Sequence, residues 1–218
     1  GYFISNGTIQ ISQENVVEFA KSDFVLYLLV GLGAQLVDGA LGMAYGVTCS
    51  SFLLSLGVSP AVSSASVHVA EMFTTGASAI SHFKFKNINK KLFKSLLIPG
   101  VSGAVIGAYL LSDVIDGNVV KPYIAFYMLI LGVIIIRKAL LKTLVKNKTK
   151  RIGLLAATGG FFDSIGGGGW GPIVTSTLLG QGRDPRYTIG SVNAAEFAIT
   201  FASGITFMIF HGVNSWQV

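Results

Sequence analysis

Long apolar runs without charge constrain this chain more than any other feature of its sequence. Residues 96–111 and 123–136 contain no Asp, Glu, Lys or Arg. With their flanks, these runs approach the ~20 apolar residues that a helix needs to cross a bilayer. Charged residues make up only 12% of the sequence, about half of the ~25% that is usual in soluble domains. The chain is therefore predicted to be an all-α integral membrane protein whose partner is the lipid bilayer.

The positive charge is gathered between the apolar runs. A formal net charge of +6 would point to nucleic acid in a soluble protein. Here most Lys and Arg residues lie in segments 84–94 and 137–151, and clusters of this kind beside membrane spans face the cytoplasm. Both segments are predicted to be cytoplasmic, and no nucleic-acid partner is expected. The single cysteine, Cys49, excludes an intramolecular disulfide and a cysteine metal cluster.

The sequence repeats itself without gaps at an offset of 125 residues. Asp38 falls on Asp163, Glu71 on Glu196, and segment 66–78 on segment 191–203. Two equivalent halves are a common construction of secondary transporters, so two homologous repeats are predicted. Equivalents of nearly all of residues 92–141 would lie beyond residue 218, so the second repeat is expected to be incomplete. The expected domains are a polar N-terminal segment (1–23), a first transmembrane repeat (24–141), a basic cytoplasmic linker (142–151) and a truncated second repeat (152–218).

The relative orientation of the repeats depends on how segment 24–56 crosses the membrane. Spans are predicted at 60–82, 95–112 and 121–141. A single crossing by 24–56 would make the repeats parallel, whereas a broken hairpin would make them inverted. Arg183 and Arg186 favour inversion, because a hairpin keeps them in the cytoplasm. Arms of about 15 residues reach only ~22 Å, short of a ~30 Å core, so re-entrant or discontinuous helices are predicted.

A run of four glycines in "FFDSIGGGGWGP", residues 161–172, locates the second break. Non-helical backbone occurs at membrane depth only where protein shields it or a wet cavity adjoins it. Free N–H groups at a helix start attract anions, although close helix packing also explains glycines. Tyr45 and Trp170, at equivalent positions, either wall a pocket or fill space. The candidate substrate-binding residues at the two breaks are Gly42, Tyr45, Gly46, Thr48, Ser51, Gly166, Gly167, Gly168, Gly169, Trp170 and Ser176.

Asp38 and Asp163 precede the two breaks at equivalent positions. A carboxylate inside a bilayer is costly and is therefore a functional candidate. Each aspartate could cap free N–H groups or take up protons, because burial disfavours the charged form of a carboxyl group. The pair could also serve an intramembrane enzyme. No nucleophile with its base and no His/Cys/carboxylate metal cluster is evident in the sequence, so no catalytic residue, metal or cofactor is expected.

A polar stripe follows each break. Side chains three and four residues apart share one helix face, and a one-sided stripe is typical of a helix that lines a cavity. Hydrogen bonding between helices is the alternative. Glu71 and Glu196 are candidates for proton coupling or gating, together with Asp38 and Asp163. The candidate substrate-binding residues on the stripes are His68, Thr75, Asn193 and Thr200.

These motifs resemble the sulfite exporter TauE/SafE family of multi-pass membrane transporters. The resemblance covers residues 24–218 and rests on "AQLVDGALGMAYGVTCSSFLLSLGVSP", "SASVHVAEMFTTGASAISH", "GGFFDSIGGGGWGPIVTSTLL" and "GSVNAAEFAITFASGITF". It implies secondary transport of sulfite, a sulfonate or a related small anion across the plasma membrane, which is the inner membrane in bacteria. An intramembrane enzyme and a membrane receptor or scaffold without transport activity are the alternatives.

Overall fold

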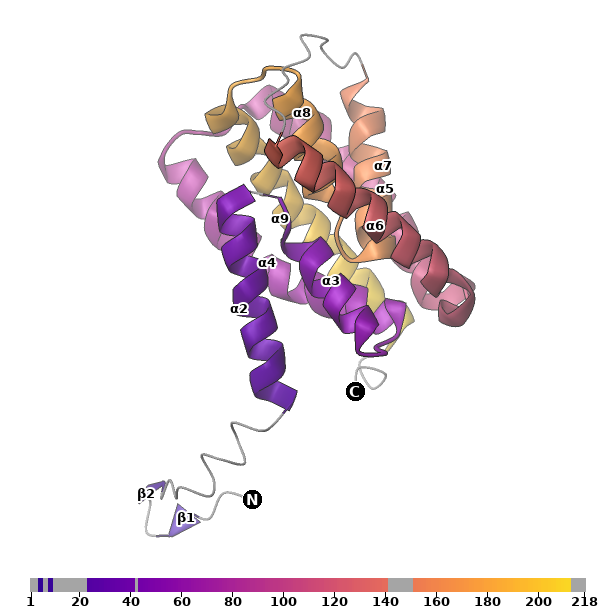
Figure 1. The fold of residues 1–218 in the computed structure, drawn as a ribbon. Helices are drawn as coiled ribbons and strands as arrows, with labels where there is room; N and C mark the ends of the chain where they lie inside the picture. Colours follow the sequence, from indigo (N-terminus) through magenta and orange to yellow (C-terminus); the bar gives the residue numbers. More distant parts are fainter. Residues whose placement is uncertain (1–3, 6–7, 10–22, 42, 141–150, 213–218) are drawn as a thin grey trace.

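A computed structural model of the protein describes residues 4–5, 8–9, 23–41, 43–140 and 151–212 (Figure 1). A short antiparallel pair of strands, β1 (Ile4–Ser5) and β2 (Thr8–Ile9), precedes the helices and pairs Ile4 with Ile9. The helices are α2 (Asp23–Leu41), α3 (Tyr45–Ser55), α4 (Pro60–Lys84), α5 (Lys90–Tyr109), the π-helix η1 (Leu110–Val114), α6 (Gly117–Leu140), α7 (Ile152–Gly166), the π-helix η2 (Gly171–Thr175), α8 (Ser176–Gly180) and α9 (Pro185–Phe210).

Three described helical segments are long and apolar enough to cross a membrane: Lys90–Val114, Gly117–Arg137 and Pro185–Phe210. The first two correspond to the spans predicted at 95–112 and 121–141, and the all-helical membrane class is confirmed. The predicted span 60–82 is present as the 25-residue helix α4. It is less apolar than the other three because its polar stripe faces the protein interior, where His68 and Glu71 are buried.

Both regions predicted to be broken are helix pairs joined by a non-helical turn (Figure 1). The second arm of the first pair is α3, with 11 residues, and the second arm of the other pair is η2 followed by α8, with five residues each. At ~1.5 Å per residue these arms reach only ~15 Å, about half of a ~30 Å hydrocarbon core. The first arms, α2 and α7, have 19 and 15 residues. The two arms of each helix pair are therefore unequal in length, whereas two arms of about 15 residues each were expected. Each break lies directly before the shorter arm.

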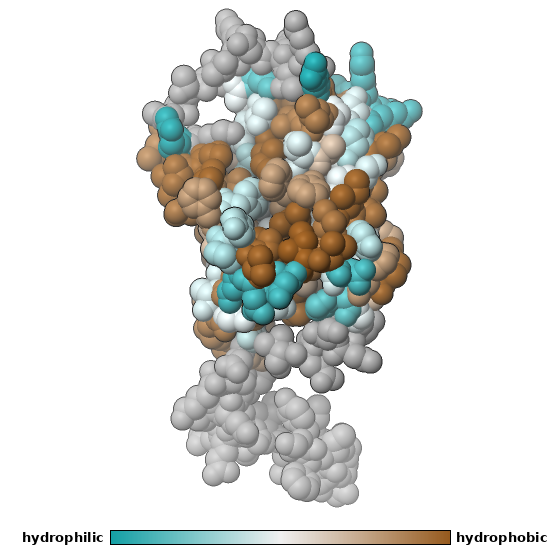
Figure 2. All heavy atoms as spheres, turned by 90° about the vertical axis from the view of Figure 1, so that its right-hand side faces the viewer, coloured by the Kyte–Doolittle hydropathy of each residue, from teal (hydrophilic) through white to brown (hydrophobic). Residues whose placement is uncertain are grey.

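The basic ends of several helices lie on one side of the molecule. The end of α4 and the starts of α5, α7 and α9 are at the top of Figure 1. Arg186 at the start of α9 donates hydrogen bonds to Asn87 Oδ1 at 2.5 Å and to the carbonyl oxygen of Phe85 at 3.2 Å. The α4–α5 loop is thus beside Arg186, as the charge pattern predicts. Figure 2 shows hydrophobic residues across the middle of one face and hydrophilic residues above and below them.

Small residues bring α5 and α7 into close contact. A Cβ added to Gly103 would overlap the carbonyl oxygen of Ala157, and one added to Gly160 would overlap the carbonyl oxygen of Gly100. Close backbone approach of this kind is how small residues hold membrane helices together. Gly103 and Gly107 have the four-residue spacing of small residues that favours helix contact, and a Cβ on Gly107 would overlap the carbonyl oxygen of Phe161 in the same way.

We expect Gly103→Ala to destabilise the protein by about 3 kcal/mol or more, because the new methyl group meets backbone that cannot rotate away. Gly132→Ala in α6 is the matched control, since a Cβ there meets no heavy atom within 4 Å. Unfolding in detergent by increasing SDS measures both free energies. Equal midpoints for the two variants would show that α5 and α7 are not packed as described.

Candidate functional site

The two helix breaks cross in direct contact. A Cβ added to Gly46 would lie 2.7 Å from the carbonyl oxygen of Gly167 and 2.8 Å from Cα of Gly168. A Cβ on Gly168 would in turn overlap the backbone of Gly46 and Val47. Ser50 Oγ donates a hydrogen bond to the Gly167 carbonyl at 2.6 Å. Glycine at this crossing is therefore a packing requirement, and the close-packing explanation of these residues holds.

Asp38 and Asp163 cap the short arms with the same geometry. Asp38 Oδ1 accepts hydrogen bonds from the N–H groups of Ala44 and Tyr45 at 2.8 and 3.2 Å. Asp163 Oδ1 accepts from the N–H groups of Gly169 and Trp170 at 2.7 and 2.9 Å. In both cases the donors lie six and seven residues after the aspartate. Capping, one of the roles considered for these carboxylates, is thus what both aspartates do.

Most N–H groups of the four-glycine run are already occupied. Gly167 and Gly168 donate theirs to the main-chain carbonyl of Asp163 at 2.7 and 3.1 Å, and Gly169 donates to the cap. The run therefore does not offer the row of free donors that was predicted for an anion. Its Gly167 has φ +67°, a left-handed conformation that favours glycine and ends α7.

Other N–H groups at the crossing precede the first hydrogen bond of their helix. The helical ladder of α3 starts with Thr48 N–H to Ala44 O at 3.1 Å, so Gly46 and Val47 come before it. In the second break the ladder starts with Ile173 N–H to Gly169 O at 2.9 Å, so Gly171 comes before it. All three residues line a cavity at the crossing.

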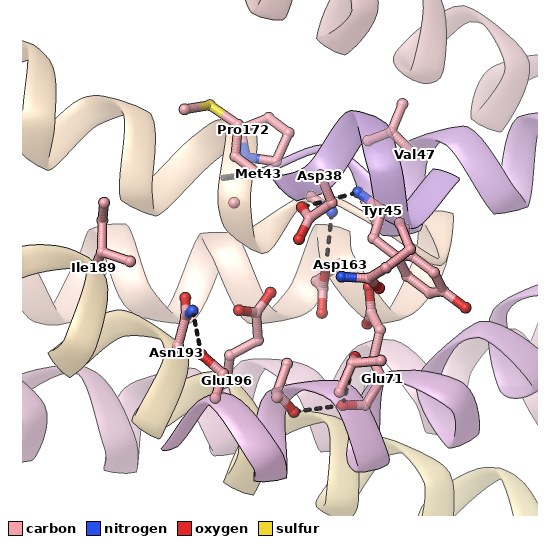
Figure 3. A pocket seen from close by; sticks show the side chains of 18 residues that line it. Asp38, Met43, Tyr45, Val47, Glu71, Asp163, Pro172, Ile189, Asn193 and Glu196 are labelled. Atoms are coloured by element: carbon pink, nitrogen blue, oxygen red, sulfur yellow. Dashed lines mark hydrogen bonds between the residues drawn. The ribbon is translucent and has the colours of Figure 1, made fainter. Parts of the chain in front are cut away.

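The cavity has a volume of about 140 Å³ and lies between the two breaks and the helices α4 and α9. Figure 3 shows side chains reaching it from all of these elements, with the carboxylates of Asp38, Glu71, Asp163 and Glu196 converging on it. The structure thus brings together Asp38 and Glu196, which are 158 positions apart in the sequence. The residues predicted from the sequence that line it are Asp38, Tyr45, Gly46, Glu71, Thr75, Asp163, Gly168, Gly169, Asn193 and Glu196.

Several predicted residues lie elsewhere. Thr48 and Ser51 line a separate apolar cavity against α6. Trp170 is fully buried among apolar side chains, so it fills space, whereas Tyr45 walls the cavity. Thr200 is buried and donates to the carbonyl oxygen of Phe197 at 3.0 Å. His68 and Gly167 do not line the cavity and lie behind residues that do, where they contact Asp163 and Ser50. Gly166 packs against Tyr127, and Ser176 donates a hydrogen bond to the carbonyl oxygen of Pro172. Gly42 lies outside the described residues.

Some lining residues were not predicted from the sequence as binding residues. Gln35 lies one helical turn before Asp38, and this three-residue spacing was a usable signal. Ser78 belongs to the polar stripe of α4 and accepts a hydrogen bond from Asn193 Nδ2 at 2.9 Å. The remaining ones are Met43, Val47, Thr74, Gly171, Pro172 and Ile189; apart from the hydroxyl of Thr74, nothing in their residue types marks a polar site.

The charge of the cavity is unusual for a site inside a membrane. Four carboxyl groups line it, and none of the described lining residues is Lys or Arg. In a medium of low dielectric constant, like charges this close repel one another strongly. The cavity therefore needs positive charge, from protons or from a bound cation, before an anion can enter it.

His68 is fully buried behind the cavity wall. Its Nε2 lies 3.2 Å from Asp163 Oδ2, and its Nδ1 lies 2.7 Å from the carbonyl oxygen of Ser64. One donor atom each of His68, Glu71 and Asp163 lie within 4.8 Å of one another. This is the group of described residues that could hold a metal ion, although no metal was expected from the sequence.

Comparison with known proteins identifies the family. Residues 27–218 match the family described as sulfite exporter TauE/SafE. The chain belongs to this family. A Bacillus subtilis (strain 168) protein described as "Probable membrane transporter protein YtnM" is 45% identical over 193 residues, which are 85% of this chain and 64% of that protein. The chain thus spans just under two thirds of the length of this relative. No solved structure shows significant similarity to the chain.

We expect Asp38→Ala to lower the free energy of unfolding by at least about 1 kcal/mol, because two N–H groups of the α3 start lose their acceptor, and by more if no water replaces it. Asp38→Asn keeps an oxygen at the capping position and is expected to restore most of this loss. Unfolding of the two purified variants in the same detergent measures the difference. If alanine and asparagine destabilise the protein equally, the carboxylate does not act as a cap.

Proposed function

We propose that the protein is a secondary transporter that moves a small sulfur-containing anion, such as sulfite or a sulfonate, across the plasma membrane, the inner membrane in bacteria. The single observation that carries the proposal is the polar cavity at the crossing of the two breaks. Membership of the TauE/SafE family supports the class of substrate. Since a water molecule takes up ~30 Å³, a cavity of about 140 Å³ fits an ion of a few non-hydrogen atoms.

The donors for this anion are backbone and amide N–H groups. Gly46, Val47 and Gly171 supply main-chain N–H groups at the starts of the short arms, where the helix dipole is positive. Asn193 reaches the same cavity from α9. Its side-chain amide has two N–H groups, and the hydrogen bond to Ser78 uses one of them. Broken helices that present their starts to a substrate near the membrane midplane are a recurring arrangement in secondary transporters.

We further propose that the two halves are inverted repeats. The caps of Asp38 and Asp163 are equivalent at the same offset of 125 residues as the sequence match. In Figure 1 the α2–α3 pair begins and ends toward the bottom, and the α7–α8 pair begins and ends toward the top. This arrangement supports an inverted relationship. Rocking of one half against the other about the cavity would then give alternating access.

Asn193→Ala is expected to weaken anion binding at least about tenfold, because a hydrogen bond to a charged ligand contributes about 1.5–3 kcal/mol. Asn118→Ala, an exposed asparagine at the start of α6, is the matched control and should change binding less than threefold. Thermal stabilisation of the detergent-purified protein by sulfite, sulfate, thiosulfate and taurine measures affinity. Alanine at Gly167 or Gly168 would be a poor test, because these positions are packing sites.

Absence of stabilisation by every one of these anions, in wild-type protein that unfolds cooperatively, would refute the assignment of a sulfur-containing anion. Uptake of the best ligand into proteoliposomes then separates transport from binding alone. A receptor would bind the anion but would not move it.

Proton coupling through Glu71 and Glu196 stays a prediction from the sequence, and Glu196 gives the cleaner test. Glu71 packs against the chain crossing, where its Oε1 lies 2.8 Å from the Cβ position of Gly46. A neutral Glu196 does not repel an anion, so binding should weaken as pH rises and the residue becomes charged. Glu196→Gln is expected to flatten this dependence of anion affinity on pH. The same pH profile in wild type and variant would exclude Glu196 as the coupling group.

A further inference from the structure

The protonation of the buried imidazole follows from its neighbours. His68 Nδ1 faces the carbonyl oxygen of Ser64 at 2.7 Å and the hydroxyl oxygen of Ser64 at 3.3 Å. A carbonyl can only accept, and the Ser64 hydroxyl already donates its hydrogen to the carbonyl oxygen of Ser164 at 2.5 Å. Nδ1 therefore carries the ring hydrogen. In the neutral imidazole, Nε2 then has a lone pair and no hydrogen.

This lone pair points at another acceptor. Asp163 Oδ2 lies 3.2 Å from His68 Nε2, and a carboxylate oxygen has no hydrogen to give. Glu71 adds a carboxylate oxygen within 4.8 Å of the other two donor atoms. Its Oε2 is buried and has no hydrogen-bond partner in the part of the chain that the structure describes, and the whole residue is only 5% exposed. Three electron-pair donors thus face one another. A proton on Nε2 would satisfy two of them, and a metal cation can satisfy all three.

We propose that His68, Glu71 and Asp163 form a binding site for one divalent transition-metal cation at the wall of the cavity. One imidazole nitrogen with two carboxylate oxygens suits Zn²⁺, Mn²⁺ or Co²⁺, since imidazole and carboxylate ligands are shared by these ions. At metal–ligand bonds of ~2.0–2.2 Å, two ligands of one ion lie roughly 3–3.5 Å apart. The Nε2–Oδ2 distance of 3.2 Å already fits, whereas the Glu71 oxygen, within 4.8 Å of the other two donor atoms, completes the set once its side chain moves closer to them.

The surroundings of the three ligands have the features of a metal site. A metal-binding histidine usually donates its other N–H to a carbonyl or carboxylate, as Nδ1 of His68 does to Ser64. Asp163 Oδ1 is held by the N–H groups of Gly169 and Trp170, so Oδ2 is oriented toward His68. Glu71 and Asp163 both line the cavity, which leaves the ion a side open to a further ligand.

Only one of the two equivalent positions has this ligand set. At the offset of 125 residues, Glu196 corresponds to Glu71 and Asp38 to Asp163, but Asn193 stands in place of His68. A neutral amide donates hydrogen bonds through its nitrogen and offers no imidazole lone pair. A single ion per chain, on the His68 side, is therefore expected.

A metal ion accounts for more of the geometry than a proton does. A proton between Nε2 and Oδ2 would satisfy two acceptors and leave Glu71 Oε2 without a partner. A divalent ion satisfies all three and adds two positive charges to a cavity lined by four carboxyl groups. The role of the metal ion rests on the proposed function, because the ion would attract the transported anion and offer an open coordination position to one oxygen of that anion.

The test is binding of the metal alone, without any anion, to the purified protein in detergent after treatment with EDTA. Zn²⁺ and Mn²⁺ are titrated by calorimetry, and Co²⁺ is followed by its visible absorption, which reports coordination by nitrogen and oxygen. Glu71→Gln and His68→Gln keep similar volume but remove a ligand, so each should weaken metal binding at least about tenfold. Asp113→Asn is the control, since it removes an exposed carboxylate of η1 that is not part of the cavity lining, and its metal binding is expected to stay within threefold of wild type.

One Co²⁺ or Zn²⁺ per chain that depends on His68 and Glu71, in variants with wild-type thermal unfolding, supports the site. Lack of binding by the wild-type protein overturns it, as does binding that Glu71→Gln and Asp113→Asn weaken equally. Anion stabilisation measured with and without EDTA keeps the two proposals apart. Anion binding without metal binding would refute the metal site alone, whereas metal binding without any anion effect would refute the assigned substrate.

Discussion

The structure depends on the crossing of two interrupted helices, each capped by its own aspartate. A helix end inside a membrane leaves N–H groups without water to satisfy them, and each unsatisfied group costs several kcal/mol. Asp38 and Asp163 satisfy two such groups each, which makes the short arms possible. Glycine then lets the two breaks touch through their backbones. The cavity exists because two breaks meet in one place.

The helices α4 and α9 follow from the same constraint. A buried crossing with capped ends is polar, so the helices that cover it must present polar side chains toward it and apolar ones toward lipid. The stripe of α4 does this with Ser64, His68 and Glu71, while Phe73, Ile80 and Phe83 of the same helix are exposed. The low hydropathy of α4 is the consequence of its position beside the crossing.

Much of this arrangement was predictable from the sequence, because it depends on local patterns. Apolar runs locate the long helices, the spacing of Glu71 and Thr75 locates the polar face, and the offset of 125 residues pairs Asp38 with Asp163. Which donors remain free was not predictable. The N–H groups of Gly167 and Gly168 bond to the carbonyl of Asp163, a detail of turn geometry that sequence does not reveal. The approach of Asp163 to His68, 95 residues apart, likewise depends on how α7 packs against α4.

The sign of the charge connects the structure to the choice of substrate. Four carboxyl groups at a site with a few backbone donors would favour a cation if all were ionised, yet the family membership points to an anion. Asp38 and Asp163 are partly neutralised by the N–H groups that they accept, because a charge-assisted hydrogen bond disperses the charge of the carboxylate. Glu71 and Glu196 have no comparable partners among the described residues, and their charge must be offset by something that binds. In the proposed anion site, two uncompensated glutamates would make anion binding conditional on a cation, and such a condition is how a carrier couples two ions.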